Sequence, residues 1–214
     1  MDITQTIALT MGVGWASGIN LYAAILTLGY LGTTGNIDLP PGLDILTNPM
    51  VMLSAGLMYC VEFFADKIPG IDSGWDAIST FIRIPAGAIL AAGAVGDVSQ
   101  AAQLAAAIGG GALATGSHVT KAGSRVLINA SPEPFSNWTA SIGEDVVVIA
   151  GLWAALYNPV LFIVLLVLFI LLMIWLLPRL WRGIKKVFSF ITRLFNKSGT
   201  ETGTITDVGK IDKQ

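Results

Sequence analysis

Six stretches of the sequence are apolar over close to the ~20 residues that a helix needs to cross ~30 Å of hydrocarbon. They fall at 5–31, 49–65, 77–96, 101–118, 140–157 and 159–178. The pattern therefore predicts an all-α integral membrane protein, with about six transmembrane helices in a bundle over residues 1–178. The fifth stretch is short and carries Glu144 and Asp145, so either this stretch or the segment 66–82 could be re-entrant instead.

Two of the stretches predict different surroundings. The sixth, VLFIVLLVLFILLMIWLL, is apolar on every face, which suits a helix that meets lipid over most of its surface. The fourth, AAQLAAAIGGGALATG, consists mainly of small residues that let helix backbones approach closely, so we expect it near the centre of the bundle. Gly14 and Gly18 would also permit close helix pairing, which leaves a homo-oligomer open.

Short internal matches indicate a possible repeat. The triplet ASG at 16–18 resembles ATG at 114–116, and AGL occurs at both 55–57 and 150–152. These matches would pair the first three helices with the last three. Because each half would hold an odd number of spans, the result would be two inverted three-helix repeats, as in many transporters.

The chain changes character after Pro178. Residues 179–197, RLWRGIKKVFSFITRLFNK, place apolar side chains at helical spacing with basic residues between them. This pattern is typical of an amphipathic helix on a membrane surface that carries anionic lipid. Residues 198–214 are polar and turn-rich, and we expect a disordered cytoplasmic tail there.

Charge sets the expected orientation. The chain is 54% hydrophobic and 12% charged, which excludes an ordinary soluble domain. The segments 32–48 and 97–100 and the turn at Asn158 contain no Lys or Arg. Cytoplasmic loops retain Lys and Arg, so these segments are predicted to lie outside and both termini in the cytoplasm. The expected partners are the lipid bilayer and the anionic lipids of its inner leaflet, and no nucleic acid.

Carboxylates concentrate in VEFFADKIPGIDSGWD, residues 61–76, which also contains Lys67. Glu62 and Asp66 are four residues apart, as are Asp72 and Asp76, so each pair shares a helix face. Such carboxylates could bind a hard cation or relay protons. Alternatively, Asp72 caps the third helix and Asp76 favours its positively polarised start.

Basic groups form a matching stripe. His118, Lys121 and Arg125 lie on one face of the fourth predicted helix, and Arg83 lies within the third. Burying either set of charges alone is costly, so we expect Glu62 and Asp66 to face the stripe across a cytoplasmic vestibule. Contact with an anionic substrate or headgroup is the alternative.

Three further residues are candidates for a substrate pathway. Asn20 and Tyr22 lie in the middle of the first stretch, where an amide in hydrocarbon normally faces the bundle interior. An interhelical hydrogen bond is the alternative role for Asn20. Glu133 lies in the proline-containing loop SPEPFSNW, residues 131–138, and offers one more carboxylate.

Several common sites are excluded. GSHVTKAGS lacks the residue order of a phosphate-binding loop, so no nucleotide or other cofactor is expected. His118 is the only histidine, which makes zinc improbable. A metal, if one is bound, would use the carboxylates of Glu62, Asp66, Asp72 and Asp76.

The motifs ASGINLY, VEFFADKIPGIDSGWD, FIRIPAGA, KAGSR and SPEPFSN occur in this order between residues 16 and 137. Together they resemble the bacterial membrane-protein family catalogued as domain of unknown function 4126. Ile84 stands where the family would favour a second proline, which affects only a local kink. The resemblance implies a multi-pass protein of the bacterial inner membrane and no particular activity.

Three functions fit these residues. A small transporter or channel of unknown substrate is favoured by polar residues within the helices and by charges gathered at one membrane face. A non-catalytic scaffold or lipid-headgroup-binding factor would use the basic face. A membrane-embedded metal-dependent enzyme acting on a lipid headgroup would use the carboxylates with His118 as base, but no transferase motif matches, and we do not expect an enzyme.

Overall fold

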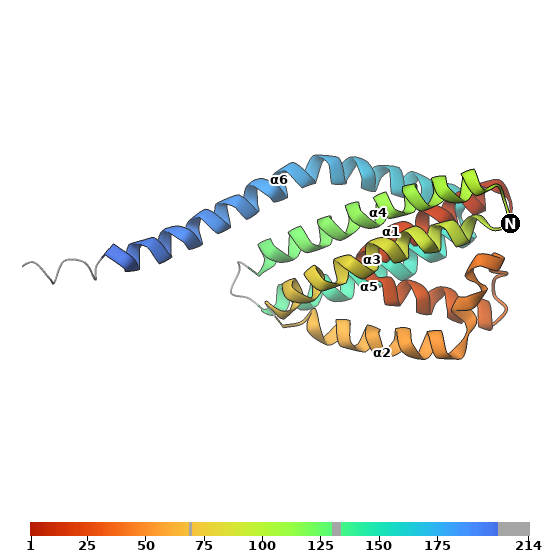
Figure 1. Ribbon diagram of the computed structural model, residues 1–214, viewed down its shortest axis with the longest axis horizontal. Coiled ribbons are helices and arrows are strands. Elements are labelled where there is room, and N and C mark those ends of the chain that lie inside the picture. The colour runs from red at the N-terminus through yellow and green to blue at the C-terminus, as the bar shows by residue number, and fades with distance from the viewer. Residues whose placement is uncertain (69, 130–133, 201–214) are drawn as a thin grey trace, which may run out of the picture.

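The computed structural model describes residues 1–68, 70–129 and 134–200. Over these residues every regular element is a helix, as predicted, and there is no strand. Figure 1 shows an elongated bundle with the far part of the last helix projecting from it. The elements are α1 (Ile3–Thr33), η1 (Pro41–Thr47, a 3-10 helix), α2 (Pro49–Ala65), α3 (Ile71–Val95), α4 (Gln100–Ile128), α5 (Pro134–Tyr157) and α6 (Pro159–Thr200).

Helix α1 is broken at Asn20. It begins with a capping box in which the Asp2 carboxylate accepts a hydrogen bond from the backbone N–H of Gln5, at 2.7 Å. At Asn20 the backbone is extended, with φ −146° and ψ 96°, so two shorter helices meet there. We call residues 3–19 the first arm of α1 and residues 21–33 its second arm.

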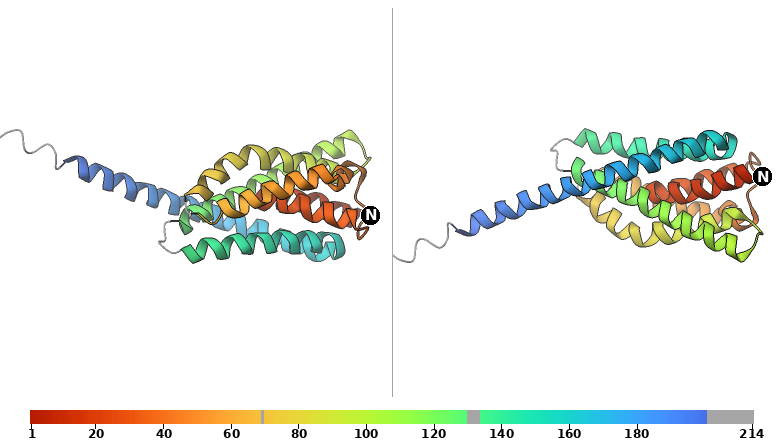
Figure 2. Two further views of the ribbon diagram at one scale, coloured as in Figure 1. Left: turned by 90° about the horizontal axis from the view of Figure 1, so that it is seen from below. Right: turned by 90° about the horizontal axis from the view of Figure 1, so that it is seen from above.

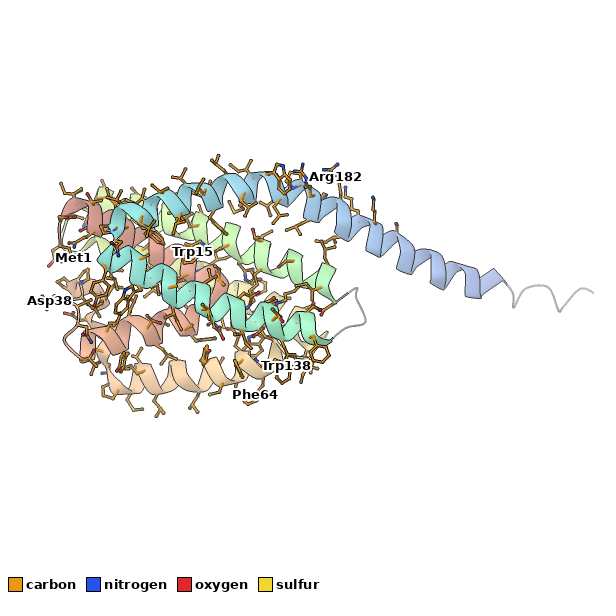
Figure 3. The ribbon with its side chains drawn as sticks, turned by 180° about the vertical axis from the view of Figure 1, so that it is seen from behind. Met1, Trp15, Asp38, Phe64, Trp138 and Arg182 are labelled. Atoms are coloured by element: carbon orange, nitrogen blue, oxygen red, sulfur yellow. The ribbon has the colours of Figure 1, made fainter. Side chains whose placement is uncertain are left out.

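The two arms of α1 run in opposite directions. Met1, Thr6 and Asp38 line one shallow hollow, and Figure 3 shows Met1 and Asp38 at the same end of the bundle. Tyr157, at the end of α5, donates a hydrogen bond to the carbonyl oxygen of Asn36 at that end. Helix α1 therefore reaches the interior and returns toward the end at which it began, so the structure does not show the predicted straight helix over 5–31.

The bundle has two distinct ends. Figure 3 places Phe64 and Trp138 opposite Met1 and Asp38, and Figures 1 and 2 show α6 extending beyond that opposite end. We call the two the N-terminal end (residues 1–6, 34–48, 96–99 and 158) and the basic end (residues 66–68, 70, 129 and α6 after Pro178). The N-terminus and the end of α6 thus lie at opposite ends of the bundle. The prediction that both termini are cytoplasmic stays a prediction, because the structure contains no membrane.

A bend joins η1 to α2. Their axes differ by 68° where the chain passes Asn48, whose side chain accepts a hydrogen bond from the N–H of Met50 and caps α2. Proline stands at the first position of both helices, where its missing N–H has no intrahelical acceptor to lose. The chain then runs through α2 to the basic end.

Small residues bring the first arm of α1, α3 and α4 into backbone contact. A Cβ atom on Gly14 would lie 2.6 Å from the Cα of Gly110, and one on Gly87 would lie 2.6 Å from the Cβ of Ala114. Only glycine fits at such approaches, because any side chain would push the helices apart. The Ala/Gly-rich α4 lies inside the bundle, as its composition predicted.

Helix α6 is continuous. It passes Pro178 without ending and reaches Thr200, so the predicted boundary at residue 179 between bundle and surface helix is not a break in structure. Figures 1 and 2 show this helix leaving the bundle at the basic end. The tail expected at 198–214 lies outside the described residues from position 201 onward.

By length and composition, four described helices could each cross a membrane: α1, α3, α5 from Phe135 and α6 up to Lys186. The bent pair of η1 and α2 would add a fifth. The six predicted spans are therefore not all supported by their helices. The inverted repeat finds no support either, since α1 is broken at Asn20 whereas α4, its expected counterpart, is one helix.

Candidate functional site

The site is built around the break in α1. The side-chain oxygen of Asn20 accepts a hydrogen bond from the N–H of Ala23, at 2.9 Å. Asn20 therefore caps the second arm, and asparagine is among the residues best suited to that position. The cap satisfies one of the backbone donors that every helix start leaves without an intrahelical partner.

Helix α4 supplies partners for the first arm. The Lys121 ammonium donates to the carbonyl oxygen of Ile19 at 3.2 Å, and the Ser117 hydroxyl donates to that of Trp15 at 2.9 Å. The last carbonyls of a helix lack intrahelical partners and carry partial negative charge, so a cation is favourable there. One lysine thus binds the end of the first arm directly.

Asp145 connects the break to two further helices. Its carboxylate accepts hydrogen bonds from the side-chain amide of Asn20 and the hydroxyl of Tyr59, both at 2.8 Å. These contacts join α1 with α2 and α5 beside the break. Both polar groups of the Asn20 side chain are therefore hydrogen-bonded: its oxygen forms the cap, and its NH₂ group donates to Asp145.

Lys121 also lies at the centre of a cluster of carboxylates. Its Nζ is 3.1 Å from Asp66, 3.3 Å from Glu62 and 3.8 Å from Asp76. A fourth carboxylate, that of Glu144 on α5, lies 3.3 Å away. A single ammonium therefore faces acids from α2, α3 and α5.

Two arginines complete this ion network. Arg83 pairs with Glu62 at 2.6 Å and with Asp76 at 3.4 Å. Arg125 pairs with Glu144 at 2.8 Å and with Asp66 at 3.4 Å. We call the set of seven side chains the ion network: Glu62, Asp66, Asp76, Arg83, Lys121, Arg125 and Glu144.

The ion network is buried. Six of its side chains are at most 4% exposed, and Glu144 is 17% exposed. Arg83 is twelve residues from the start of α3, about 18 Å along the helix at ~1.5 Å per residue. Charges this far inside an apolar bundle are rare and usually functional, and each requires a partner because its desolvation is costly.

His118 lies against the ion network as a neutral group. Thr80 donates its hydroxyl proton to the carbonyl oxygen of Asp76 at 2.9 Å, so its contact with Nε2 of His118, at 2.7 Å, makes Nε2 the donor. Arg83 can only donate, so Nδ1 of His118, at 3.3 Å, is the acceptor. The two contacts assign a single proton to the ring, on Nε2.

Three polar side chains from α3, α4 and α5 are hydrogen-bonded to one another at the basic end, and we call them the polar latch: Asp72, Asn129 and Asn137. The side-chain amide of Asn129, at the end of α4, donates to both carboxylate oxygens of Asp72 at 2.8 Å. Asn137 on α5 donates in turn to Asn129 at 2.7 Å. Asp72 also accepts from the N–H groups of Gly70 and Ser73, as expected of an acid at the start of α3.

Lys67 lies outside the ion network. Its ammonium is 2.9 Å from the ring centroid of Phe63 and donates to the Phe63 carbonyl oxygen at 3.1 Å. Partial burial lowers the pKa of Lys67, while the carboxylates of Asp145 and Asp66 oppose this shift. Lys67 thus serves as a local contact rather than as part of the central cluster.

The structure therefore gathers most of the candidate residues. The predicted pairing of Glu62 and Asp66 with the basic stripe is confirmed for Lys121. Among the ion pairs of the described residues, Arg125 contacts Asp66 but not Glu62. Tyr22 lies on the second arm, where it lines a hollow against α2. Glu133 lies outside the described residues.

Sequence reasoning missed two acids in particular. Glu144 belongs to the ion network, and Asp145 binds Asn20. The available signal was their position inside an apolar stretch, where ionisable residues rarely stand without a partner. The same two acids also make the stretch resemble a poor span, which obscures this signal.

The carboxylates do not form a metal site in this structure. Among the described residues, no group of three or more His, Cys, Asp or Glu side chains is arranged to hold a metal ion. The candidate metal ligands of the sequence are divided instead, with Asp72 in the latch and Glu62, Asp66 and Asp76 paired to cations. His118 uses both ring nitrogens and is not placed as a free base.

A bundle of long apolar helices around buried ion pairs is compatible with a multi-pass helical membrane protein. The chain belongs to the family described as "Domain of unknown function (DUF4126)", whose model matches residues 7–179. The matched region covers α1 from residue 7 onward and every residue of the ion network. Comparisons with curated proteins and with solved structures gave no match.

Proposed function

We propose that this protein is a small membrane transporter or channel for an ionic substrate, in which the broken helix α1 and the ion network form the transport site. The observation that carries the proposal is the break at Asn20 inside the bundle. Lys121 binds the C-terminal end of the first arm, and the Asn20 side chain caps the N-terminal end of the second arm. Transporters typically place ion sites at such interrupted helices, where free backbone groups and half-helix dipoles meet.

The arrangement in the membrane follows from the same break. Helices α2 to α6 each run between the two ends, and α1 is a re-entrant element that enters and leaves at the N-terminal end. Five crossings and one re-entrant helix replace the six spans and inverted repeats expected from the sequence. Polar backbone at the break is tolerated in hydrocarbon only because protein surrounds it.

Orientation follows from the basic residues. The loops at the N-terminal end contain no Lys or Arg, whereas Lys67 and the basic part of α6 lie at the other end. The basic end is therefore cytoplasmic, the N-terminus is outside, and the membrane is the bacterial inner membrane.

A labelling experiment tests this topology. In a Cys60→Ser background, Ile3→Cys and Asn36→Cys should both react with a membrane-impermeant thiol reagent added outside intact cells. Ser124→Cys lies toward the basic end of α4 and is part-buried. It should not react with the reagent outside intact cells, because the basic end faces the cytoplasm. A straight first span would leave Ile3→Cys protected, so position 3 separates the two topologies.

A second labelling experiment tests the transport site without knowledge of the substrate. Ser17 is fully buried beside the break, whereas Leu57 is 62% exposed on the lipid-facing side of α2. If water reaches the break during a transport cycle, a charged reagent should label Ser17→Cys in membranes and leave Leu57→Cys unlabelled. Protection of both positions, with Ile3→Cys reactive, would favour a closed scaffold instead.

Contact with anionic lipid is a second role for the basic end. Arg179, Arg182, Lys185 and Lys186 are exposed on α6, and Arg179 stacks on Trp175 with its Cζ 3.5 Å from the ring centroid. Arginine and tryptophan together are typical of the membrane interface. Tighter binding of the purified protein to phosphatidylglycerol than to phosphatidylcholine vesicles, lost when all four are replaced by glutamine, would support this role.

A further inference from the structure

The ion network contains one more acid than it has cations. Among the described residues, its four carboxylates face only three basic side chains. If all seven groups were ionised, one formal negative charge would remain inside the bundle. A buried charge without compensation is costly, so a proton or a bound cation must neutralise it in the stable state.

The geometry favours a proton over a metal cation. The Lys121 ammonium occupies the space between the carboxylates, at 3.1 to 3.8 Å from each of the four. A second cation at that centre would be repelled by the ammonium and by both guanidinium groups. A proton needs no such space, because it joins a carboxylate oxygen directly.

His118 does not take this proton. Its Nδ1 accepts from Arg83, so a second ring proton would face a donor that carries positive charge. Protonation would break that contact and add charge beside a guanidinium. The proton therefore belongs on a carboxylate.

Asp76 is the most weakly paired of the four carboxylates. Its Oδ1 lies 3.4 Å from Arg83 and 3.8 Å from Lys121, and each of the other three acids has a basic partner at 3.1 Å or less. Its Oδ2 has no hydrogen-bond partner, although the side chain is 2% exposed. Each of the four acids has two basic partners, and those of Asp76 are the most distant, so protonating Asp76 gives up the weakest ion pairs. Glu62 and Asp66 also have one oxygen without a hydrogen-bond partner, but each of them has a closer cation.

The charged surroundings of Asp76 come from several helices. Glu62 lies on α2 and Asp66 at its C-terminal end, and Glu144 lies on α5. Helix α4 contributes Lys121, Arg125 and the neutral His118, and Arg83 lies on the same helix as Asp76. Tyr22 on α1 interacts electrostatically with Glu62 and Arg83. Neutralising Asp76 leaves three acids with three cations.

We propose that Asp76 is the proton-binding residue of the transport site and that H⁺ is a transported or coupled ion of this protein. In the binding step, hydronium transfers its proton to Oδ2 of Asp76 and leaves as water, and the carboxylate becomes a neutral carboxylic acid. Release is the reverse reaction. This inference rests on the proposed function and identifies an ion that the site handles.

Infrared spectroscopy tests the binding step directly. In the full-length protein reconstituted in phosphatidylglycerol and phosphatidylethanolamine vesicles, lowering the pH should produce the carbonyl stretch of a buried protonated carboxylic acid. Asp76→Asn should abolish this band. Glu144→Gln, which makes the same acid-to-amide change at a carboxylate with both oxygens paired to Arg125, should retain it.

Proton flux tests the coupling. With the membrane potential clamped, vesicles that contain the wild type and an internal pH-sensitive dye should acidify after an external pH drop, and Asp76→Asn should reduce the rate to that of empty vesicles. Asp76→Glu retains a carboxyl group at the site, so it should keep both the band and the flux with a shifted pH midpoint. This variant keeps the test decisive if Asp76→Asn does not fold.

The outcomes separate this inference from the transporter proposal. Absence of the band in the wild type, its survival in Asp76→Asn, or undiminished proton flux in that variant would overturn the role of Asp76. Labelling of Ser17→Cys would in those cases still support a transporter of another ion. Loss of the band and of the flux only at position 76 would support the inference.

Discussion

Helices α1 and α6 are both long and apolar, and they occupy opposite environments. In the most apolar window of α1, 83% of the residues are buried in the bundle, whereas in α6 only 11% are. Helix α1 is broken at Asn20 and reverses, and α6 passes through Pro178 unbroken. Mean hydropathy over these windows is 1.3 in α1 and 3.5 in α6, so the helix that faces protein is the less apolar of the two.

The difference lies in side-chain size and polarity. The first arm of α1 contains Gly12, Gly14 and Gly18, and each touches a neighbouring helix where a Cβ would collide or crowd. Helix α6 presents large aliphatic side chains instead, of which Leu168 is 55% exposed. Small residues favour contact between backbones, and large ones favour contact with lipid chains.

The two helices also differ in what their backbones require. The break in α1 leaves carbonyl and N–H groups that must find partners, and Lys121 and Asn20 supply them. Helix α6 satisfies its backbone almost entirely within itself. The buried charges of α4 are therefore part of what allows α1 to reverse inside the bundle.

The largest effect that would test this comparison is expected at Lys121. Lys121→Met removes the cation shared by four carboxylates, so the free energy of unfolding in mixed micelles should fall by ~3–5 kcal/mol. Lys186→Met removes an exposed cation from α6 and should change it by less than ~1 kcal/mol. Equal effects of the two substitutions would mean that water reaches the ion network in the folded protein.

The next effect concerns the glycine contacts of α1. Gly14→Leu should lower the free energy of unfolding by at least ~1–3 kcal/mol, because the side chain would meet the backbone of Gly110. Gly143→Leu places the same side chain on α5, where no atom lies within 4 Å, and should have little effect. Tolerance of leucine at position 14 in thermal unfolding would contradict the close approach of α1 to α4.

A smaller effect tests which charges interact. Glu62 contacts Lys121 at 3.3 Å, whereas Arg125 pairs with Asp66 and Glu144. Double-mutant cycles on the free energy of unfolding should therefore give a coupling of ~0.5–3 kcal/mol for Glu62→Gln with Lys121→Met. The coupling of Glu62→Gln with Arg125→Met should be clearly smaller. A larger coupling with Arg125→Met than with Lys121→Met would show that Glu62 pairs with Arg125 instead of Lys121 in the folded protein.

The clustering of charges could be predicted because it depends on local spacing. Acids four residues apart on α2 and bases three and four residues apart on α4 each define one helix face, and burial then forces the faces together. Glu62, Asp66 and Lys121 meet for this reason. The contact of Asp76 and Arg83 with the same cluster depends on how α3 packs, which spacing does not specify.

The reversal of α1 could not be predicted from hydropathy. Its two arms follow each other directly in the sequence and together have the length and apolar character of a single span. Asn20 was recognised as polar, but its use as a helix cap depends on Ala23, Asp145 and Lys121 being nearby in space. The continuity of α6 could not be read from its sequence pattern either. Proline normally interrupts a soluble helix, yet Pro178 lies within a helix that runs on to Thr200.

The smallest expected effect separates the two roles of Asn20. Asn20→Ser keeps an oxygen that can cap the second arm but cannot reproduce the donor that binds Asp145, whereas Asn20→Ala loses both contacts. The alanine variant should therefore be less stable than the serine variant by ~0.5–2 kcal/mol in the free energy of unfolding, the usual value of a helix cap. The matched change Asn48→Ala removes the exposed cap of α2 and gives the scale for a cap outside the break. If alanine and serine at position 20 are equally stable, the cap does not hold the second arm.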